Sequence, residues 1–222
     1  MIKVVLFDLD DTLYAEIQFV SSGFRAVSNT FGTAQFPPEV VEGLLWQFYR
    51  DDRRAVLDRL AATIWEAGEA YWVALGFGTV SDLSQAMIQC YREHVPGINL
   101  FPDAERVLFR LAKRGIRVGL VTDGIAAVQR RKVEALGLSK LEFVMYTDEL
   151  APNRAAWKPS PQPFLAALEY FAVLPQMACY VGDNPEKDFT GPKSLGMKTV
   201  WIRREGGVYA AKYMDSADQD KV

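Results

Sequence analysis

The sequence holds very little histidine and cysteine. One histidine, His94, and two cysteines, Cys90 and Cys179, occur among its 222 residues. Histidine-based catalysis and histidine-rich zinc sites need more than one such side chain, and two distant thiols form neither a metal quartet nor a disulfide framework. We therefore expect both thiols to be free and buried, and we expect carboxylates to carry any acid–base chemistry.

The sequence also lacks a basic cluster and a long apolar run. The formal net charge is −3, and no stretch concentrates lysine and arginine enough to favour nucleic-acid binding. No apolar stretch approaches the roughly 20 residues that span a bilayer, and the first apolar run stops at Asp8, too early for a secretory signal. We expect a cytoplasmic protein that binds neither nucleic acid nor a membrane. The sequence does not indicate an oligomeric state.

What the chain does have is a group of carboxylates directly after its first apolar run. Residues 4–7 are continuously apolar, which favours a parallel strand covered on both faces. Asp8, Asp10, Asp11 and Thr12 follow at once. Anionic oxygens at the rim of a dry core cost on the order of several kcal/mol unless a cation or hydrogen-bond donors meet them. We expect a metal ion and an anionic substrate to meet them here.

The rest of the chain separates into two kinds of sequence. Residues 15–97 have helical spacing and few strand signals, whereas strands and helices alternate from about Phe101 onward. Strands are predicted at 4–7, 116–122, 143–147, 178–183 and 198–202, and helices include 102–115, 129–136 and 163–171. This alternation predicts an α/β core with a doubly wound, Rossmann-like parallel sheet, built from residues 1–14 and 98–222, and an inserted all-helical domain at 15–97.

Polar residues follow several of the later strands too. Thr122, Asp123 and Gly124 come after the second strand, Lys158 lies in the loop after the third, and Asp183 with Asp188 comes after the fourth; these are the further site candidates. A turn or a helix cap could explain any one of these clusters. Because the carboxyl ends of parallel strands meet at one edge of a sheet, however, all of them should lie together with Asp8.

These clusters, in this order and with a helical insert between the first and second, resemble the motifs of the haloacid dehalogenase superfamily, in its branch with a helical cap. The resemblance implies that Asp8 is a nucleophile that forms an aspartyl phosphate and that Asp10 is the acid–base residue, with a pKa raised by its neighbours. It implies that Thr122 donates to the phosphate and that Lys158 holds the nucleophile and phosphate together. Asp11 carries no role in that pattern.

The resemblance also implies a cofactor and substrate contacts. Oxygen ligands without histidine or thiolate favour Mg²⁺, held by Asp8, Asp10 through its carbonyl, Asp183 and Asp188, the last directly or through water. The remaining substrate-binding candidates are Thr12, Asp123 and Gly124. Asp123 stands where asparagine is commoner, so it adds negative charge that weakens phosphate binding unless it points away or is paired.

We therefore predict a Mg²⁺-dependent phosphatase that hydrolyses a small phosphorylated metabolite, with the helical insert closing over the cleft. Similarity of residues 122–138 and 157–164 to superfamily members of sugar metabolism favours a sugar phosphate. Dehalogenation is disfavoured because Asp10 and Asp183 are retained, and a phosphonate hydrolase with a cap lysine is disfavoured because no lysine occurs from residue 4 to 112. A sugar phosphomutase and a non-catalytic binding or regulatory protein on the same fold stay open.

Overall fold

The computed structural model describes residues 1–209, and the chain divides into two compact units. The core unit comprises Met1–Gln18 and Ile98–Val222, and the helical unit comprises Phe19–Gly97. Residues 210–222, which the sequence assigns to the core, lie outside the described part of the chain.

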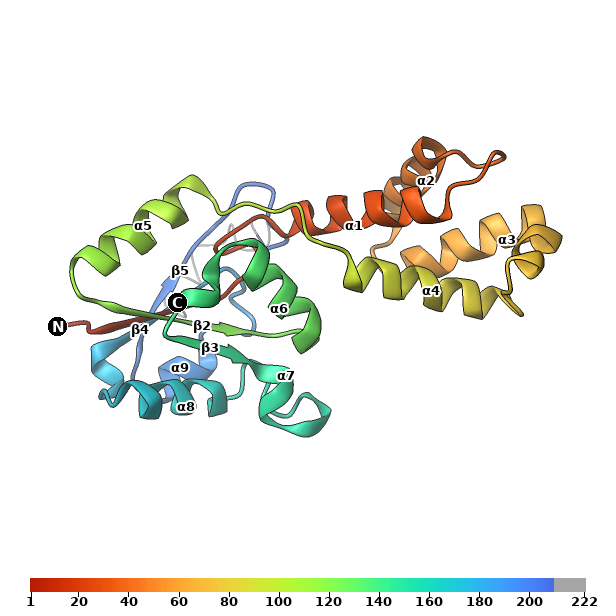
Figure 1. Ribbon diagram of the computed structural model, residues 1–222. Helices are drawn as coiled ribbons and strands as arrows, with labels where there is room; N and C mark the ends of the chain where they lie inside the picture. The colour runs from red at the N-terminus through yellow and green to blue at the C-terminus, as the bar shows by residue number, and fades with distance from the viewer. Residues whose placement is uncertain (210–222) are drawn as a thin grey trace. The chain divides into compact units, whose positions relative to one another are not determined.

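A parallel sheet of five strands forms the centre of the core unit (Figure 1). Its strands are β1 Val4–Phe7, β2 Arg117–Thr122, β3 Phe143–Tyr146, β4 Ala178–Gly182 and β5 Lys198–Trp201. The order across the sheet is β3-β2-β1-β4-β5, and every neighbouring pair is parallel. The chain order reverses on either side of β1, which is where ligands bind in sheets of this kind.

Both faces of β1 are covered, as expected for a continuously apolar strand. Val4 and Leu6 point to one face, and Val5 and Phe7 point to the other. The first face packs on side chains of α8, namely Phe164, Ala167, Leu168 and Phe171. On the second face, Val5 and Phe7 line a cavity of about 320 Å³ together with α5 residues Ala104, Val107 and Leu111.

Helices connect the strands of the core unit. They are α5 Pro102–Lys113, α6 Ala126–Ala135, α7 Thr147–Leu150, α8 Gln162–Phe171 and α9 Thr190–Ser194. Helix α6 begins three residues before the predicted start at Gln129, because Gly124, with φ +125°, turns the chain directly from β2 into the helix. The described core thus has the α/β fold class that the sequence predicts.

The helical unit contains four helices in its described residues. They are α1 Glu16–Phe31, which begins in the core unit, α2 Pro38–Asp51, α3 Val56–Ala74 and α4 Val80–Glu93. Their shared apolar core includes the fully buried side chains Val27, Leu45, Leu60 and Leu83.

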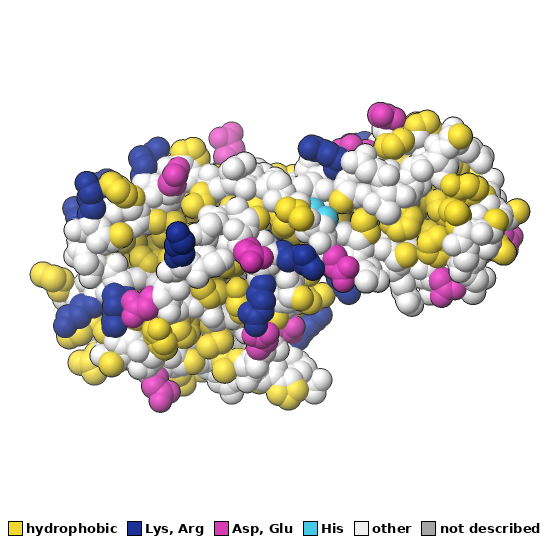
Figure 2. Space-filling view, viewed as in Figure 1, with side chains coloured by type: hydrophobic (Ala, Val, Ile, Leu, Met, Phe, Trp, Pro, Cys, Tyr) yellow, Lys and Arg dark blue, Asp and Glu magenta, His cyan; other side chains and the backbone are white. Residues whose placement is uncertain are grey.

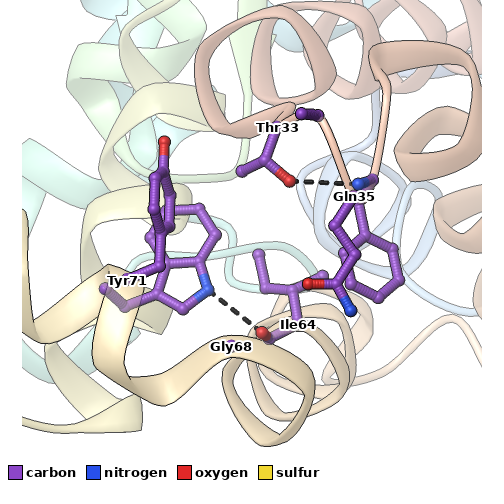
Figure 3. Close-up of a pocket in the computed structure, with 8 residues that line it drawn as sticks. Thr33, Gln35, Ile64, Gly68 and Tyr71 are labelled. Atoms are coloured by element: carbon purple, nitrogen blue, oxygen red, sulfur yellow. Dashed lines mark hydrogen bonds between the residues drawn. The ribbon is translucent and has the colours of Figure 1, made fainter.

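Helix α3 is kinked at Gly68, whose backbone leaves the helical region (Figure 3). The indole N–H of Trp72 donates to the carbonyl of Ile64 at 3.0 Å and so satisfies an acceptor next to the kink. Beside it lies a pocket of about 210 Å³, lined by the loop after α1 and by α3 residues that include Tyr71.

The two cysteines and the single histidine belong to different parts of the chain: Cys90 and His94 lie at the end of α4, and Cys179 lies in β4. Cys179 is buried as expected, but Cys90 is only partly buried, although it packs against the core of the helical unit; both are free thiols. The His94 ring contacts the Ser22 hydroxyl and the Tyr91 carbonyl oxygen, each at 2.6 Å.

The surface agrees with the absence of a basic cluster in the sequence. On the face that Figure 2 shows, positive and negative side chains are interspersed over the core unit. Within residues 1–209, no helix has the length and apolar composition needed to cross a membrane.

Candidate active site

Strand ends bring the first group of polar side chains together. β1 lies between β2 and β4, and Phe7 is level with Leu120 and Val181. Asp8 therefore leaves β1 beside the ends of both neighbours, and its N–H donates to the carbonyl of Val181 at 2.9 Å. Thr122 ends β2, and Asp183 directly follows β4.

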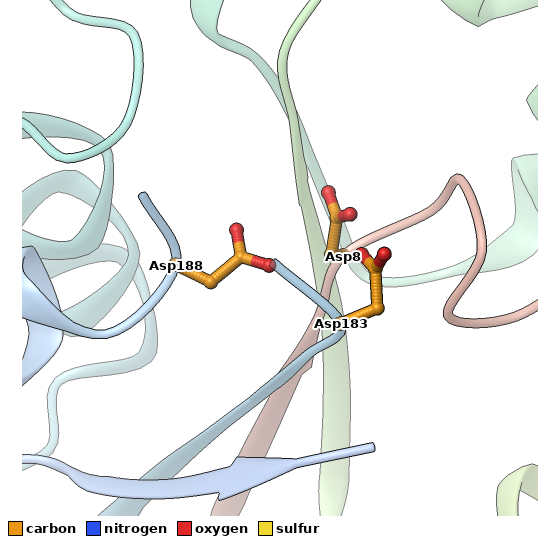
Figure 4. Close-up of side chains that lie close together, drawn as sticks. All are labelled: Asp8, Asp183 and Asp188. Atoms are coloured by element: carbon orange, nitrogen blue, oxygen red, sulfur yellow. The ribbon is translucent and has the colours of Figure 1, made fainter. Parts of the chain in front are cut away.

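Three buried carboxylates form the centre of the site (Figure 4). Asp8, Asp183 and Asp188 each place an oxygen within 4.8 Å of the others. Asp188 reaches this position through a tight turn, since the Asn184 N–H donates to its Oδ2 at 2.9 Å and its own N–H donates to the Asn184 carbonyl at 2.9 Å. Gly182 makes room for it, because a Cβ at Gly182 would lie 2.7 Å from the carboxyl carbon of Asp188.

Lys158 is the buried cation that faces these carboxylates. Its Nζ lies 2.6 Å from Asp8 Oδ1 and 2.8 Å from Asp188 Oδ1, and its side chain is fully buried. The third contact of the ammonium is the Tyr180 hydroxyl, at 2.8 Å. The ammonium of a lysine has three N–H donors, so each donor of Lys158 has an acceptor.

Asp10 lies in a different set of contacts. Lys132 and Gln129 of α6 donate to its two oxygens, from Nζ at 2.7 Å and from Nε2 at 2.9 Å, and the Tyr14 hydroxyl donates as well. Burial alone raises the pKa of Asp10, but the Lys132 ammonium and these hydrogen bonds outweigh it, and the pKa is lowered. The raised pKa predicted for Asp10 is therefore wrong, because the expectation counted only neighbouring carboxylates and missed a buried lysine.

The residues at the end of β2 lie against the Gln129 side chain of α6. The Thr122 hydroxyl accepts from Gln129 Nε2 at 2.6 Å. Gly124 has a φ of +125°, which favours glycine, and a Cβ there would lie 3.2 Å from the Gln129 side chain. Thr12, also expected to contact substrate, donates its hydroxyl to Asp183 Oδ1 at 3.4 Å.

Asp123 is paired by protein groups on both of its oxygens. Oδ1 accepts from the Thr147 hydroxyl at 2.8 Å and from the Lys158 N–H at 3.2 Å, and Oδ2 lies 3.3 Å from Lys187 Nζ. Its side chain is only 5% exposed. The side chain is thus positioned to hold the Lys158 backbone. Pairing with Lys187 compensates the negative charge that would otherwise weaken phosphate binding.

Asp11 has a structural function. With φ +49°, it turns the chain out of the strand end, and its Oδ1 accepts from the Glu16 N–H at the start of α1. Its Oδ2 accepts from the Val208 N–H at 3.1 Å. Each oxygen of the Asp11 carboxylate thus accepts from a main-chain N–H group.

The three carboxylates Asp8, Asp183 and Asp188 have too little positive charge around them to offset their burial and mutual repulsion. Burial raises the pKa of Asp183 to about 8, with repulsion from Asp8 and Asp188 adding to the effect. Burial also raises the pKa of Asp8 to about 6, although Lys158 acts in the opposite direction. Three carboxylates that offer hard oxygen ligands fit a divalent cation such as Mg²⁺.

Comparison with known proteins gives the family. Residues 5–202 match the family model described as Haloacid dehalogenase-like hydrolase. The chain belongs to the haloacid dehalogenase-like hydrolases. The predicted superfamily is thereby confirmed, together with its α/β fold.

Individual members of this hydrolase family resemble the chain over nearly its whole length. A glyceraldehyde 3-phosphate phosphatase of Pyrococcus furiosus is 33% identical over an alignment of 230 positions, which covers 98% of this chain and 88% of the relative. One of the same name from Methanopyrus kandleri is 30% identical, over 97% of this chain and 87% of its own. The crystal structure of a 2-haloacid dehalogenase from Pseudomonas syringae has a TM-score of 0.59 at 26% identity and covers 96% of this chain and 92% of its own. The phosphatase names of the relatives support the predicted class of phosphoric monoester hydrolase.

Several residues of this hydrolase site were missed from the sequence, and four of them show what signal was available. Gln129 and Lys132 lie three positions apart on α6, on the side that also buries Val133, so two polar residues at buried helix positions were the available signal. Tyr180 interrupts the apolar strand β4 with a hydroxyl that needs a partner. Lys187 lies in the turn between Asp183 and Asp188, where no periodic pattern draws attention to it.

Proposed function

We propose that this chain is a Mg²⁺-dependent phosphatase that hydrolyses a small phosphomonoester, of the sugar or triose phosphate class, through an aspartyl-phosphate intermediate. The observation that carries the proposal is the buried arrangement of Lys158 between Asp8 and Asp188, with Asp183 alongside. Relatives named as glyceraldehyde 3-phosphate phosphatases support the substrate class. The cytoplasmic location inferred from the sequence stays a prediction.

In the first step, an Asp8 oxygen attacks phosphorus and the bond from phosphorus to the ester oxygen breaks. The phosphoryl group is then esterified to Asp8, and the departing alkoxide takes a proton from Asp10. Division into two displacements replaces one slow hydrolysis by two easier steps. Lys158 orients the Asp8 carboxylate and compensates its charge as the anionic phosphate approaches.

In the second step, water attacks the phosphorus of the aspartyl phosphate and passes a proton to Asp10. Asp8 is released as a carboxylate and inorganic phosphate leaves. The lowered pKa of Asp10, in which Lys132 and hydrogen bonds outweigh burial, keeps the side chain as a carboxylate, which is the form that can accept this proton.

Asp8 and Asp183 would hold Mg²⁺ with the backbone carbonyl of Asp10, and Asp188, whose oxygens already accept from Lys158 and Asn184, would support the site. When bound, the ion supplies positive charge for the phosphoryl oxygens and relieves the repulsion among the carboxylates. We assign the helical unit, Phe19–Gly97, the role of a cap that excludes water from the site.

The test is a panel of sugar phosphates and other phosphometabolites with the Mg²⁺-loaded full chain. The account expects release of one inorganic phosphate per ester consumed, and no release by Asp8→Asn. Isomerised ester without phosphate release would instead indicate a mutase. No turnover of any member, or of a generic aryl phosphate, would indicate a binding protein.

A further inference from the structure

Lys158 has no N–H donor left for a substrate oxygen. Its three donors go to Asp8, Asp188 and the Tyr180 hydroxyl, and no part of its side chain is exposed. A phosphate dianion placed against Asp8 therefore gains charge from Lys158 but no hydrogen bond, unless one of these contacts breaks. A second ammonium group near Asp8 would supply the charged donor that Lys158 lacks.

Lys187 is the second ammonium group close to the nucleophile. Its charge acts on Asp8 in the same direction as that of Lys158. Its side chain is 35% exposed, and within residues 1–209 the polar contact found for its Nζ is Asp123 Oδ2, at 3.3 Å. One acceptor leaves two of the three ammonium N–H groups available.

Hydrogen bonds close the turn that carries Lys187. Asn184 accepts from Glu186 N–H through its Oδ1, at 3.0 Å, and its own N–H donates to Asp188. Asp188 is in turn fixed by Lys158. The position of Lys187 is thus set by the same contacts that set the carboxylate group.

Asp123 fixes the other end of the Lys187 side chain. The Asp123 carboxylate is buried and bonded to Thr147 and the Lys158 N–H, so it is a fixed acceptor. Asparagine, the commoner residue here, would offer Lys187 no anionic partner. The aspartate therefore accounts for the placement of a lysine that an asparagine would not hold.

We propose that Lys187, positioned by Asp123, is a second phosphate-binding residue that donates directly to an oxygen of the substrate phosphate. The inference rests on the proposed phosphatase function and extends it. It also explains how the site tolerates Asp123, since the pair Asp123–Lys187 adds no net charge while placing a donor toward the phosphate.

The experiment compares Lys187→Met, Lys187→Arg, Asp123→Asn/Lys187→Met and the exposed-site control Lys198→Met, all as Mg²⁺-loaded full chains. Calorimetry measures the Kd of inorganic phosphate, and steady-state kinetics separates KM from kcat for an aryl phosphate. We expect Lys187→Met to weaken phosphate binding by about tenfold to a hundredfold, as for loss of a charged hydrogen bond. KM should rise more than kcat falls, and Lys187→Arg should recover most of the affinity.

The double variant distinguishes phosphate binding from mere neutralisation of Asp123. If Lys187 contacts phosphate, Asp123→Asn/Lys187→Met stays as weak as Lys187→Met. Wild-type affinity in the double variant, or in Lys187→Met itself, overturns the inference.

The two proposals can fail separately because phosphate binding is measured without turnover. Weakened binding in Lys187→Met supports the inference even if no ester is hydrolysed, an outcome that would refute the phosphatase. Normal hydrolysis with unchanged phosphate affinity in Lys187→Met would refute the inference and leave the phosphatase standing.

Discussion

Lys158 Nζ lies 2.6 Å from Asp8 Oδ1 with neither side chain appreciably exposed to solvent. Buried ion pairs of this kind are costly to break, since removal of one partner leaves an uncompensated charge in a dry site. Asp188 contacts the same ammonium, so removal of Lys158 would leave two buried carboxylates without their cation. The pair therefore links the stability of the core to its chemistry.

Lys158→Met should lower kcat/KM by about a hundredfold to a thousandfold, the effect of losing one preorganised charge-stabilising group. It should also lower the free energy of unfolding, measured in urea, by about 3–5 kcal/mol. The exposed Lys140→Met serves as the control and should change neither quantity. A Lys158→Met variant with wild-type kinetics would contradict the role given to this residue.

Lys132→Met should change the pH dependence of hydrolysis. The ammonium of Lys132, 2.7 Å from Asp10 Oδ1, is a main cause of the lowered pKa of that carboxyl, working against burial. Its removal raises the pKa of Asp10, so the protonated form needed by the leaving group persists to higher pH. The alkaline limb of the kcat/KM profile should move to higher pH in Lys132→Met and stay near the wild-type position in Lys132→Arg. An unmoved limb would show that Asp10 is not the acid.

Gly182→Ala should damage the site through Asp188. The new methyl carbon would lie 2.7 Å from the Asp188 carboxyl carbon, so Asp188 must shift from the position in which it contacts Lys158. We expect a loss of more than about tenfold in kcat/KM and about 1–3 kcal/mol of stability, as for overpacking. Gly43→Ala, where nothing lies within 4 Å of the added carbon, is the matched control. Activity within twofold of wild type would mean that Asp188 can shift without consequence.

Metal-free protein should become less stable as the pH rises. The pKa of Asp183 is raised from 3.8 to about 8, mainly by burial, so folding favours the protonated carboxyl. The contribution of this carboxyl to the free energy of unfolding is fully present below pH 3.8, and it is lost progressively as the pH rises toward 8. Thermal unfolding in a chelator should show this decline, and Asp183→Asn should reduce it, whereas the exposed Asp51→Asn should not.

Addition of Mg²⁺ at pH 8 should reverse the decline. An ion at a hundred times its Kd stabilises the folded state by about 2.7 kcal/mol. Asp183→Asn should lose most of this gain. Equal stabilisation of wild type and Asp183→Asn would place the ion elsewhere.

The sequence predicts the parts of this site that strand ends determine. Asp8 and Asp183 each follow an apolar run, and the parallel sheet brings such positions to one edge. Side chains that arrive from helices and turns were not predictable in the same way. Lys132 is buried on α6 and reverses the expected direction of the Asp10 pKa, and Lys187 reaches Asp123 across 64 positions of the chain. Helical spacing shows which face is buried, but not which buried polar group meets a distant carboxylate.

The central claim is that the carboxylate of Asp8 becomes covalently phosphorylated. The most direct measurement is acid quenching of Mg²⁺-loaded protein during turnover, followed by peptide mass spectrometry, with fluoroberyllate trapping as a stable mimic. The account predicts a phosphorylated peptide whose modified residue is Asp8, absent from Asp8→Asn. Phosphate attached to another residue, or undiminished turnover by Asp8→Asn, would contradict it.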